Sequence, residues 1–202
     1  RKEFGGCAGN IAYNFKKIGG EPIPVGTVGE DFDPYRKWMA ELEVNNEYVT
    51  EVPTTYTAQA FITTDIDNNQ ITAFHPGAMD FSNVNDLRSA GDADIGIISP
   101  DGKEGMLNHA RQLADLKIPF IFDPGQGMPM FDGDELSQLI KLANWVSVNE
   151  YEAEVMEKKT EMNSSEITKL VEAYIVTKGA RGSMIYSSEG LLEIPPVKGA
   201  KV

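Results

Sequence analysis

The chain opens on the run Phe4-Gly5-Gly6-Cys7-Ala8-Gly9-Asn10-Ile11-Ala12, in which small residues lead into an apolar helix pattern. Small side chains let a ligand approach the backbone, and the first turn of a helix offers unpaired N–H groups at the positive end of its dipole. Asn10 adds an amide that both donates and accepts hydrogen bonds, which suits vicinal hydroxyl groups. The run also fits a plain tight turn into a helix, and it lacks the glycine spacing of a dinucleotide site. From these residues alone, a ligand-binding turn and a plain turn both stay open.

Outward from this run, helix and strand patterns alternate along most of the chain. Ile11, Phe15 and Ile18 fall on one helix face, and Asp33 is expected to cap a second helix with Pro34 at its first position. This alternation predicts an α/β fold with a mostly parallel sheet flanked by helices. The other strands are expected at 23–28, 93–98, 118–122, 145–148, 174–177, 183–187 and 191–194, and the other helices over 103–116, after Asp132-Gly133-Asp134-Glu135, from about Glu150 and after Asn163.

Two strands rich in threonine and aromatic residues, 56–64 and 70–75, interrupt this alternation. Asp67-Asn68-Asn69 between them is typical turn sequence, so the pair predicts a β-hairpin. Because the hairpin stands outside the helix–strand order, we expect a small separate sheet. Hairpins with open edges often pair with other strands, which suggests a homodimer formed through this hairpin.

The composition narrows the classes of partner. A net charge of −13 argues against nucleic acid and against an anionic membrane surface, because both favour a basic protein face. No apolar run approaches the about 20 residues of a membrane span, and the sequence starts with no secretory segment. Cys7 is the one cysteine, which fits a reducing cytoplasm. Cys7, His75 and His109 lack metal-ligand spacing, and His109 is expected on the surface of its helix.

Polar residues follow several predicted strands, at the sheet edge where open α/β folds bind ligands. Asn149 and Glu152 come directly after the strand at 145–148, while Asp101 and Asp123 follow earlier strands. A start such as Asn-Glu-x-Glu is also an ordinary helix cap, and Asp123 can equally cap a loop. These residues alone allow both a binding role and a capping role.

A glycine-rich turn, Thr177-Lys178-Gly179-Ala180-Arg181-Gly182, follows the strand near 174–177. Lys178 and Arg181 carry positive charge in this turn, and a role for them as phosphate partners is implied only by the family resemblance described next. An ordinary hairpin turn explains the glycines equally well, so this motif too stays open between two interpretations.

Taken together, these motifs make the chain resemble a known family, the ribokinase-like (PfkB) carbohydrate and nucleoside kinases. The match to the family's first signature comprises Gly5, Gly6, Ala8, Asn10, Ala12, Gly19 and Gly29. Asn149 with Glu152 is similar to the family's N-x-x-E motif, and Thr177 with Gly179 is similar to its nucleotide-binding segment. The resemblance implies a ribokinase-like α/β fold with a small β-sheet lid, and phosphoryl transfer from ATP with Mg²⁺.

The resemblance also implies roles for individual residues. The phosphate acceptor would contact Gly5, Gly6, Cys7, Asn10, Asp101 and Phe74. ATP would meet Asn149, Glu152, Thr177, Lys178, Gly179 and Gly182, and Glu152 and Asp123 would organise Mg²⁺ through water. The segment Phe74-His75-Pro76-Gly77-Ala78-Met79 looks like bacterial nucleoside kinases, which implies an adenosine-like acceptor with Phe61 or Phe74 on its base. A sugar kinase acting on ribose or fructose, and a catalytically inactive ligand-binding module, remain alternatives.

By the same resemblance, residues 1–202 form a partial domain with lid strands at about 1–5 and 54–76. A first strand before Arg1 and the catalytic region after Val202 are absent from the sequence. In the family, that later region supplies the anion hole and the aspartate that acts as general base. Glu43 is a smaller departure, because the family commonly has glycine there; it implies either a left-handed residue or a different helix end.

We therefore expect these 202 residues alone to lack measurable kinase activity. The test is ADP production from ATP and adenosine, with protein whose mass shows that it holds only these residues. Robust ADP formation would contradict the expectation. A Gly-x-Gly-Asp sequence soon after Val202 in the complete gene would favour an enzyme, and its absence would favour a binding module.

Overall fold

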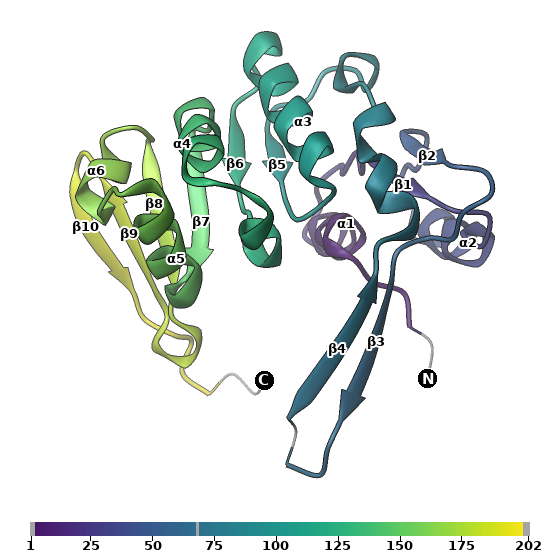
Figure 1. Ribbon diagram of the computed structural model, residues 1–202, viewed down its shortest axis with the longest axis horizontal. Coiled ribbons are helices and arrows are strands. Elements are labelled where there is room, and N and C mark those ends of the chain that lie inside the picture. The colour runs from purple at the N-terminus through teal and green to yellow at the C-terminus, as the bar shows by residue number, and fades with distance from the viewer. Residues whose placement is uncertain (1–2, 68, 200–202) are drawn as a thin grey trace. The chain divides into compact units, whose positions relative to one another are not determined.

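The computed structural model of the chain describes residues 3–67 and 69–199 and divides into two compact units (Figure 1). The first unit comprises Arg1–Ala90, and the second comprises Gly91–Val202. Within the described ranges, no helix is both long and apolar enough to cross a membrane.

Two helices and a short pair of parallel strands build the core of the first unit. Helix α1 spans Cys7–Lys17 and α2 spans Asp33–Glu41, while β1 (Gly26–Val28) pairs with β2 (Val49–Glu51). Strand β1 covers only the end of the predicted range 23–28. The buried apolar cluster between these elements consists of Ala12, Val28, Phe32, Met39 and Val44.

The start of α2 differs by one residue from the sequence prediction. Phe32, and not Asp33, is the N-cap, and its carbonyl accepts hydrogen bonds from the N–H groups of Tyr35 and Arg36 at 2.9 and 3.0 Å. Asp33 lies inside the first turn, where its negative charge favours the positive end of the helix dipole. Pro34 also lies there, since the first turn requires no N–H donor from it.

The predicted hairpin forms a separate antiparallel sheet of β3 (Gln59–Thr64) and β4 (Gln70–His75). Asp65 organises the turn, because its carboxylate accepts hydrogen bonds from the N–H groups of Asp67 and Asn69 at 2.8 and 2.9 Å. Hydrogen bonds from the Asn69 side chain and from the backbone hold the pKa of Asp65 below its usual value. Of the predicted turn residues, Asn68 lies outside the described residues.

The described residues before α1, and residues 76–90 between the hairpin and the end of the first unit, contain no strand. Residues 3–6 lead into α1 without strand pairing, so the lid strands expected at about 1–5 have no counterpart in the described part of that range. Both hairpin strands lie within the range 54–76. Two 3-10 helices, η1 (Gly77–Val84) and η2 (Leu87–Ser89), follow the hairpin.

A six-stranded mixed sheet, in the order β10-β9-β8-β7-β6-β5, forms the second unit. Strands β5 to β8 run parallel, and β9 and β10 add two antiparallel strands at one edge. This arrangement confirms the mostly parallel sheet predicted from the sequence. The strands are β5 (Gly96–Ile98), β6 (Phe120–Phe122), β7 (Trp145–Asn149), β8 (Ala173–Thr177), β9 (Ser183–Ser187) and β10 (Gly190–Ile194).

Helices α3 to α6 lie on one face of this sheet (Figure 1). Burial alternates along the strands accordingly, since Val146 and Val148 are buried while Ser147 between them is half-buried. The predicted capping box of Asp132 and Glu135 starts α4. The helices are α3 (Lys103–Leu116), η3 (Gly125–Met130), α4 (Gly133–Leu142), α5 (Glu150–Thr160), α6 (Ser164–Thr168) and η4 (Gly179–Arg181).

His109 is buried in α3 with 7% of its surface exposed, so the expected surface position is wrong. It lies three residues after Met106 and four before Leu113, and both of these residues are buried. Residues at such spacings share one helix face, so His109 belongs to the core-facing side of α3.

Glu43 has a left-handed backbone conformation, with φ of 55°. Of the two expectations from the sequence, a left-handed residue or a different helix end, the first is confirmed. The Glu43 N–H donates to the Ala40 carbonyl at 3.0 Å, and the Val44 N–H donates to the Met39 carbonyl at 3.0 Å. These are the two hydrogen bonds of a Schellman helix end, which usually has glycine at this position. Glu43 therefore keeps the helix end and bears the steric cost of its Cβ.

We predict that Glu43→Gly raises the free energy of unfolding of the first unit by about 1 kcal/mol, because glycine adopts this conformation without steric cost. Urea unfolding of the variant and the parent chain measures the difference. The matched control is Glu41→Gly at the last residue of α2, where glycine is expected to destabilise by up to about 1 kcal/mol. Equal effects of the two substitutions would contradict the assignment.

Candidate active site

The glycine-rich turn of the first unit leads directly into α1. Gly6 is the N-cap with φ of 91°, and its carbonyl accepts a hydrogen bond from the Asn10 N–H at 2.9 Å. Cys7 begins the helix and is half-buried, whereas the Asn10 side chain is exposed. The structure thus brings Gly5, Gly6, Cys7 and Asn10 together at the N-terminal end of one helix, where the helix dipole has its positive end.

The glycines of this region meet different physical demands. Gly6 and Gly19 have positive φ of 91° and 93°, a conformation that favours glycine. A Cβ on Gly29 would lie 2.3 Å from the carbonyl oxygen of Thr55. Neither positive φ nor close packing requires glycine at Gly5, since its φ is not positive and no described atom outside its chain neighbours lies within 4 Å of a Cβ built on it. The missing side chain of Gly5 leaves open surface, as a ligand-binding turn requires.

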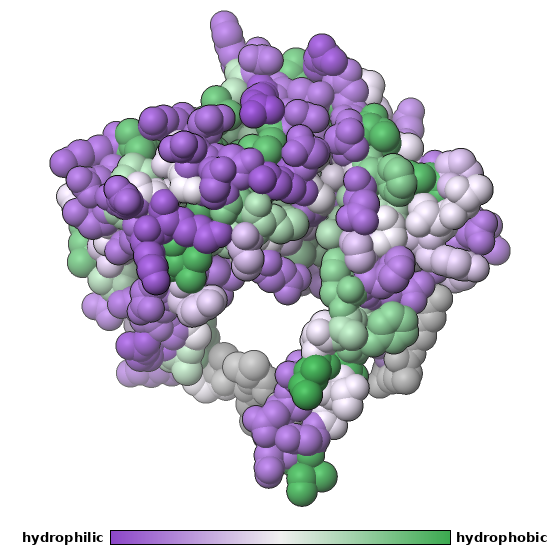
Figure 2. Space-filling model, in the orientation of Figure 1, coloured by the Kyte–Doolittle hydropathy of each residue, from purple (hydrophilic) through white to green (hydrophobic). Residues whose placement is uncertain are grey.

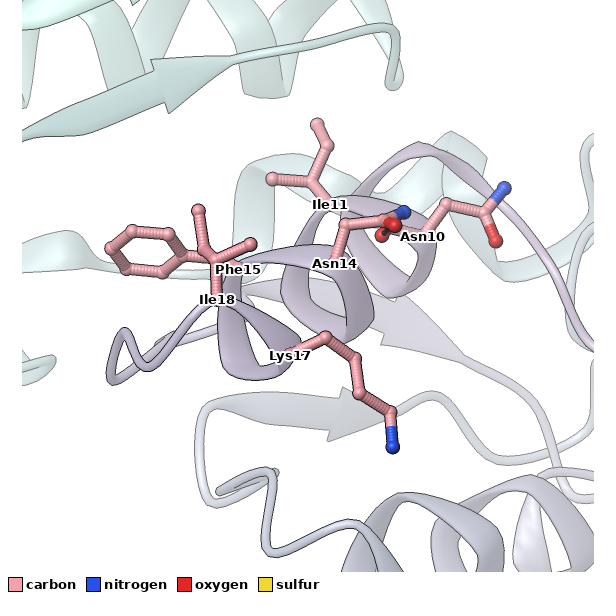
Figure 3. Close-up of a pocket in the computed structure, with 6 residues that line it drawn as sticks. All are labelled: Asn10, Ile11, Asn14, Phe15, Lys17 and Ile18. Carbon is pink, nitrogen blue, oxygen red and sulfur yellow. Dashed lines mark hydrogen bonds between the residues drawn. The ribbon is translucent and has the colours of Figure 1, made fainter. Parts of the chain in front are cut away.

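Helix α1 also carries a shallow hollow farther along its length (Figure 3). The Asn14 side chain donates a hydrogen bond to the Asn10 carbonyl at 2.8 Å, and the Asn10 amide extends away from the helix. The lining residues are Asn10, Ile11, Asn14, Phe15, Lys17 and Ile18. The hollow is mainly apolar and excludes Gly5 and Gly6, so it does not coincide with the turn.

The base of the hairpin is fixed to the loop after β1. The Thr57 N–H donates to Asp31 Oδ1 at 2.8 Å, and the Gly29 N–H donates to Thr57 Oγ1 at 3.0 Å. A Cβ on Gly77, which follows β4 at the same base, would lie 2.2 Å from the Tyr56 carbonyl oxygen. Sequence reasoning missed Asp31, because its partner Thr57 lies 26 residues away and no local pattern marks the pair.

The two lid aromatics point to opposite faces of the hairpin. Phe61 pairs with Ala73, and Phe74 pairs with Ala60 in the next register position. Adjacent register positions face opposite sides of a sheet. Both rings are more than half exposed, and Figure 2 shows hydrophobic side chains among polar ones along the projecting hairpin. Only one of the two aromatics can therefore face a given acceptor.

In the second unit, predicted site residues follow three neighbouring parallel strands. Asp101 lies after β5, Asp123 directly after β6, and Asn149 ends β7. Burial raises the pKa of Asp101 to about 6, although its Oδ1 accepts a hydrogen bond from the Gly102 N–H at 2.8 Å. Burial, and then the negative charge of Glu152, raise the pKa of Asp123. The carboxyl ends of parallel strands share one edge of the sheet, so these residues gather there.

Asn149 and Glu152 form a complete capping box at the start of α5. Asn149 Oδ1 accepts from the Glu152 N–H at 2.9 Å, and Glu152 Oε2 accepts from the Asn149 N–H at 2.8 Å. The capping interpretation is therefore correct, and it leaves the binding interpretation untested. Across residues 3–67 and 69–199, no three His, Cys, Asp or Glu side chains gather as a metal cluster.

The glycine-rich turn after β8 is the connection of an antiparallel hairpin with β9. Gly179 has φ of 54°, and Gly182 has φ of 86°. A Cβ on Gly182 would also lie 2.0 Å from the Ile194 carbonyl oxygen, so the fold itself requires this glycine. Arg181 forms an ion pair with Glu150, whereas Thr177 is exposed and Lys178 is half-buried at the start of the turn.

Comparison with known proteins assigns this arrangement to a family. Residues 1–202 match the family described as pfkB family carbohydrate kinase. The chain belongs to this family. The assignment agrees with the ribokinase-like fold and with the glycine and asparagine positions at the start of α1.

Within the pfkB family, the chain is similar to nucleoside kinases. The nucleoside kinase of Methanocaldococcus jannaschii is 32% identical over 205 residues, which cover 100% of this chain and 67% of that protein. The structure of Burkholderia thailandensis nucleoside kinase in complex with inosine is 49% identical with a TM-score of 0.95, over 100% of this chain and 66% of that one. The same kinase in complex with ADP-inosine also has a TM-score of 0.95 at 49% identity, over 100% of this chain and 64% of that one. The chain thus spans about two thirds of the length of these relatives.

The raised pKa of Asp101 predicts how stability depends on pH. An unfolded aspartate titrates near about 3.9, so between about pH 4 and about pH 6 the folded chain retains a proton that the unfolded chain has lost. The stability that this proton supplies is full below the unfolded pKa and is lost as pH rises through the folded pKa. Asp101→Asn removes the titration and keeps an oxygen for the Gly102 N–H.

We therefore expect Asp101→Asn to gain stability relative to the parent chain as pH rises from 4 to 7. Urea unfolding at several pH values measures this difference. Asp115→Asn, exposed on α3, is the matched control and should show no such gain. A stability difference for Asp101→Asn that stays constant with pH would contradict the buried position of this carboxyl.

Proposed function

We propose that the protein containing this chain is an ATP-dependent kinase that phosphorylates the primary hydroxyl of a nucleoside by in-line transfer. The observation that carries the proposal is the open turn at Gly5 and Gly6, which precedes the N-terminus of an 11-residue helix. The complex of the Burkholderia thailandensis relative with inosine supports a purine nucleoside, such as adenosine or inosine, as the acceptor.

The acceptor is held by the turn and the first turn of α1. Gly5 and Gly6 let the ribose approach the backbone, and Cys7 begins the helix directly after them, at the positive end of the helix dipole. The exposed Asn10 amide donates to one ribose hydroxyl and accepts from the other. Asp101, which is half-buried after β5 in the second unit, is the residue of that unit that the family resemblance assigns to the acceptor.

The hairpin supplies a lid over the base. Phe74 is the proposed contact, and because Phe61 lies on the opposite face, that residue does not share the role. Phe61 instead belongs to the face that is available to a second copy of the chain. An isolated two-stranded hairpin is only marginally stable in water, so pairing between two copies supports a homodimer through the lid.

ATP is held at the carboxyl edge of the sheet in the second unit. Thr177, Lys178, Gly179 and Gly182 surround the turn where the nucleotide phosphates approach the backbone. Arg181 is paired with Glu150, so Lys178 is the better cation of this turn for the phosphates. Asn149 orients Glu152 through the capping box at the next strand.

Asp123 and Glu152 fit a hydrated Mg²⁺. Both supply carboxylate oxygens, the ligands that Mg²⁺ prefers, and their mutual repulsion contributes to the raised pKa of Asp123. A divalent cation nearby relieves this repulsion. When bound, Mg²⁺ supplies neutralisation of the phosphate charge. The single cysteine and the net charge of −13 support a cytoplasmic enzyme without nucleic-acid or membrane partners.

The test compares phosphate acceptors with the full-length gene product. ATP turnover is measured against adenosine, inosine, guanosine, ribose and fructose in the presence of Mg²⁺. We expect kcat/KM for at least one purine nucleoside to exceed that for either sugar by about tenfold or more, since a base contact adds binding energy that sugars lack. Preference for ribose or fructose would favour the sugar-kinase alternative, and no turnover with any compound would favour an inactive binding module.

One substitution links this activity to the turn. Gly5→Ala is expected to raise the acceptor KM by about tenfold, because the new methyl group occupies the surface that the ribose approaches. Its thermal unfolding midpoint should stay unchanged, since the Cβ contacts no described atom. Gly26→Ala in β1 is the matched control, because its Cβ also meets no described atom within 4 Å. An unchanged acceptor KM in Gly5→Ala would contradict the proposed acceptor site.

A further inference from the structure

The backbone at Gly5 is held by a residue from another helix. The Tyr35 hydroxyl, on α2, donates a hydrogen bond to the Gly5 carbonyl at 3.0 Å. The ring of Phe4, the preceding residue, stacks on the Tyr35 ring with centroids 4.6 Å apart and planes 10° from parallel. Two independent contacts therefore connect Tyr35 to the segment that leads into the turn.

Gly9 makes room for this contact. A Cβ on Gly9 would lie 2.0 Å from the Tyr35 hydroxyl oxygen and 3.1 Å from Cζ. Gly9 has no positive φ, so close approach of Tyr35 is what requires glycine there. Gly9 is not one of the matched signature positions, and the space that Tyr35 needs explains why this residue is glycine.

Tyr35 is itself firmly placed. Its ring packs against the rings of Phe32 at 5.4 Å and Trp38 at 5.6 Å, both on the same side of α2. Phe32 belongs to the buried core of the first unit, and Trp38 packs against that core. Burial raises the pKa of the Tyr35 hydroxyl above its usual value, so it stays a proton donor over the working pH range.

Gly5 and Gly6 need such a support. Two consecutive glycines have more backbone freedom than any other pair of residues, and fixing them costs conformational entropy. If the turn visits several conformations, acceptor affinity falls by the fraction of time spent in the binding-competent one. A hydrogen bond from a residue anchored in the core raises that fraction before the acceptor arrives.

We propose that Tyr35 is a positioning residue for the acceptor, which holds the Gly5 carbonyl so that the Gly5-Gly6 turn is preorganised for ribose hydroxyls. The inference rests on the proposed function, because it assumes that the acceptor binds at this turn. Tyr35 acts through Gly5 and does not itself contact the reacting atoms.

The test uses Tyr35→Phe in the full-length gene product, which keeps the ring contacts and removes the hydroxyl. We expect the acceptor KM to rise about three- to tenfold, the range that corresponds to loss of one ordinary hydrogen bond. The KM for ATP and kcat at saturating acceptor should stay within about twofold of the parent, because the catalytic groups are untouched. Tyr13→Phe is the matched control, since Tyr13 stacks on Trp38 at 5.6 Å within the same aromatic group and has no contact with Gly5.

A second measurement separates positioning from general stability. Hydrogen–deuterium exchange of the peptide that contains residues 4–10 should become faster in Tyr35→Phe and not in Tyr13→Phe. Gly9→Ala should also raise the acceptor KM, because its methyl group displaces the Tyr35 hydroxyl. In the Tyr35→Phe background the same alanine should have a smaller effect, since the closest clash has gone.

The outcomes are distinguishable. A selective rise in acceptor KM with faster exchange at residues 4–10 supports the inference. An active parent enzyme whose Tyr35→Phe variant has unchanged KM values, or equal increases for acceptor and ATP, overturns the inference and leaves the proposed function intact. If the parent enzyme phosphorylates none of the panel compounds, the proposed function fails, and the positioning role fails with it.

Discussion

Close backbone contact at Tyr56 holds the hairpin of the first unit to its core. Gly29 lies against the backbone of Thr55 and Tyr56, and Gly77 lies against the Tyr56 carbonyl. The Ala78 N–H donates to that carbonyl at 2.8 Å, and the Thr27 hydroxyl donates to the Ala78 carbonyl at 2.7 Å in the buried interior. No side chain larger than hydrogen fits at either glycine without moving backbone. The residues before β3 and after β4 are thereby fixed to β1, so the core of the first unit determines the direction in which the hairpin extends.

The loop after β1 continues from the hairpin base toward the Gly5-Gly6 turn. It leaves Gly29, binds the start of β3 through Asp31, enters α2 at Phe32 and reaches the glycine turn through Tyr35. Only five residues lie between Gly29 and Tyr35, so a displacement at the hairpin base passes to Tyr35 through a short segment. The hairpin and the Gly5-Gly6 turn are thus both bonded to one segment, so their positions depend on each other within the first unit.

Sequence reasoning predicted the regular elements well, because periodicity and capping are local signals. The capping box of Asp132 and the parallel strands that end near Asp123 are examples. It wrongly placed His109 on the surface, because the prediction followed its polar side chain and disregarded its spacing from the apolar residues Met106 and Leu113. It could not predict Asp31 or the role of Gly9, since their partners Thr57 and Tyr35 lie 26 residues away in each case and become neighbours only through folding.

The glycines from Gly5 to Gly29 form one pattern in the sequence, but they meet different physical demands in the structure. Gly6 provides a backbone conformation, Gly9 provides space for Tyr35, and Gly29 provides space for Tyr56. Each of these glycines would be needed even in a protein that bound nothing. Gly5 differs, because neither its conformation nor its neighbours within the described residues require glycine. Gly5 therefore indicates a ligand at this turn more strongly than the number of matched positions does, and Tyr35 holds the carbonyl of that same residue.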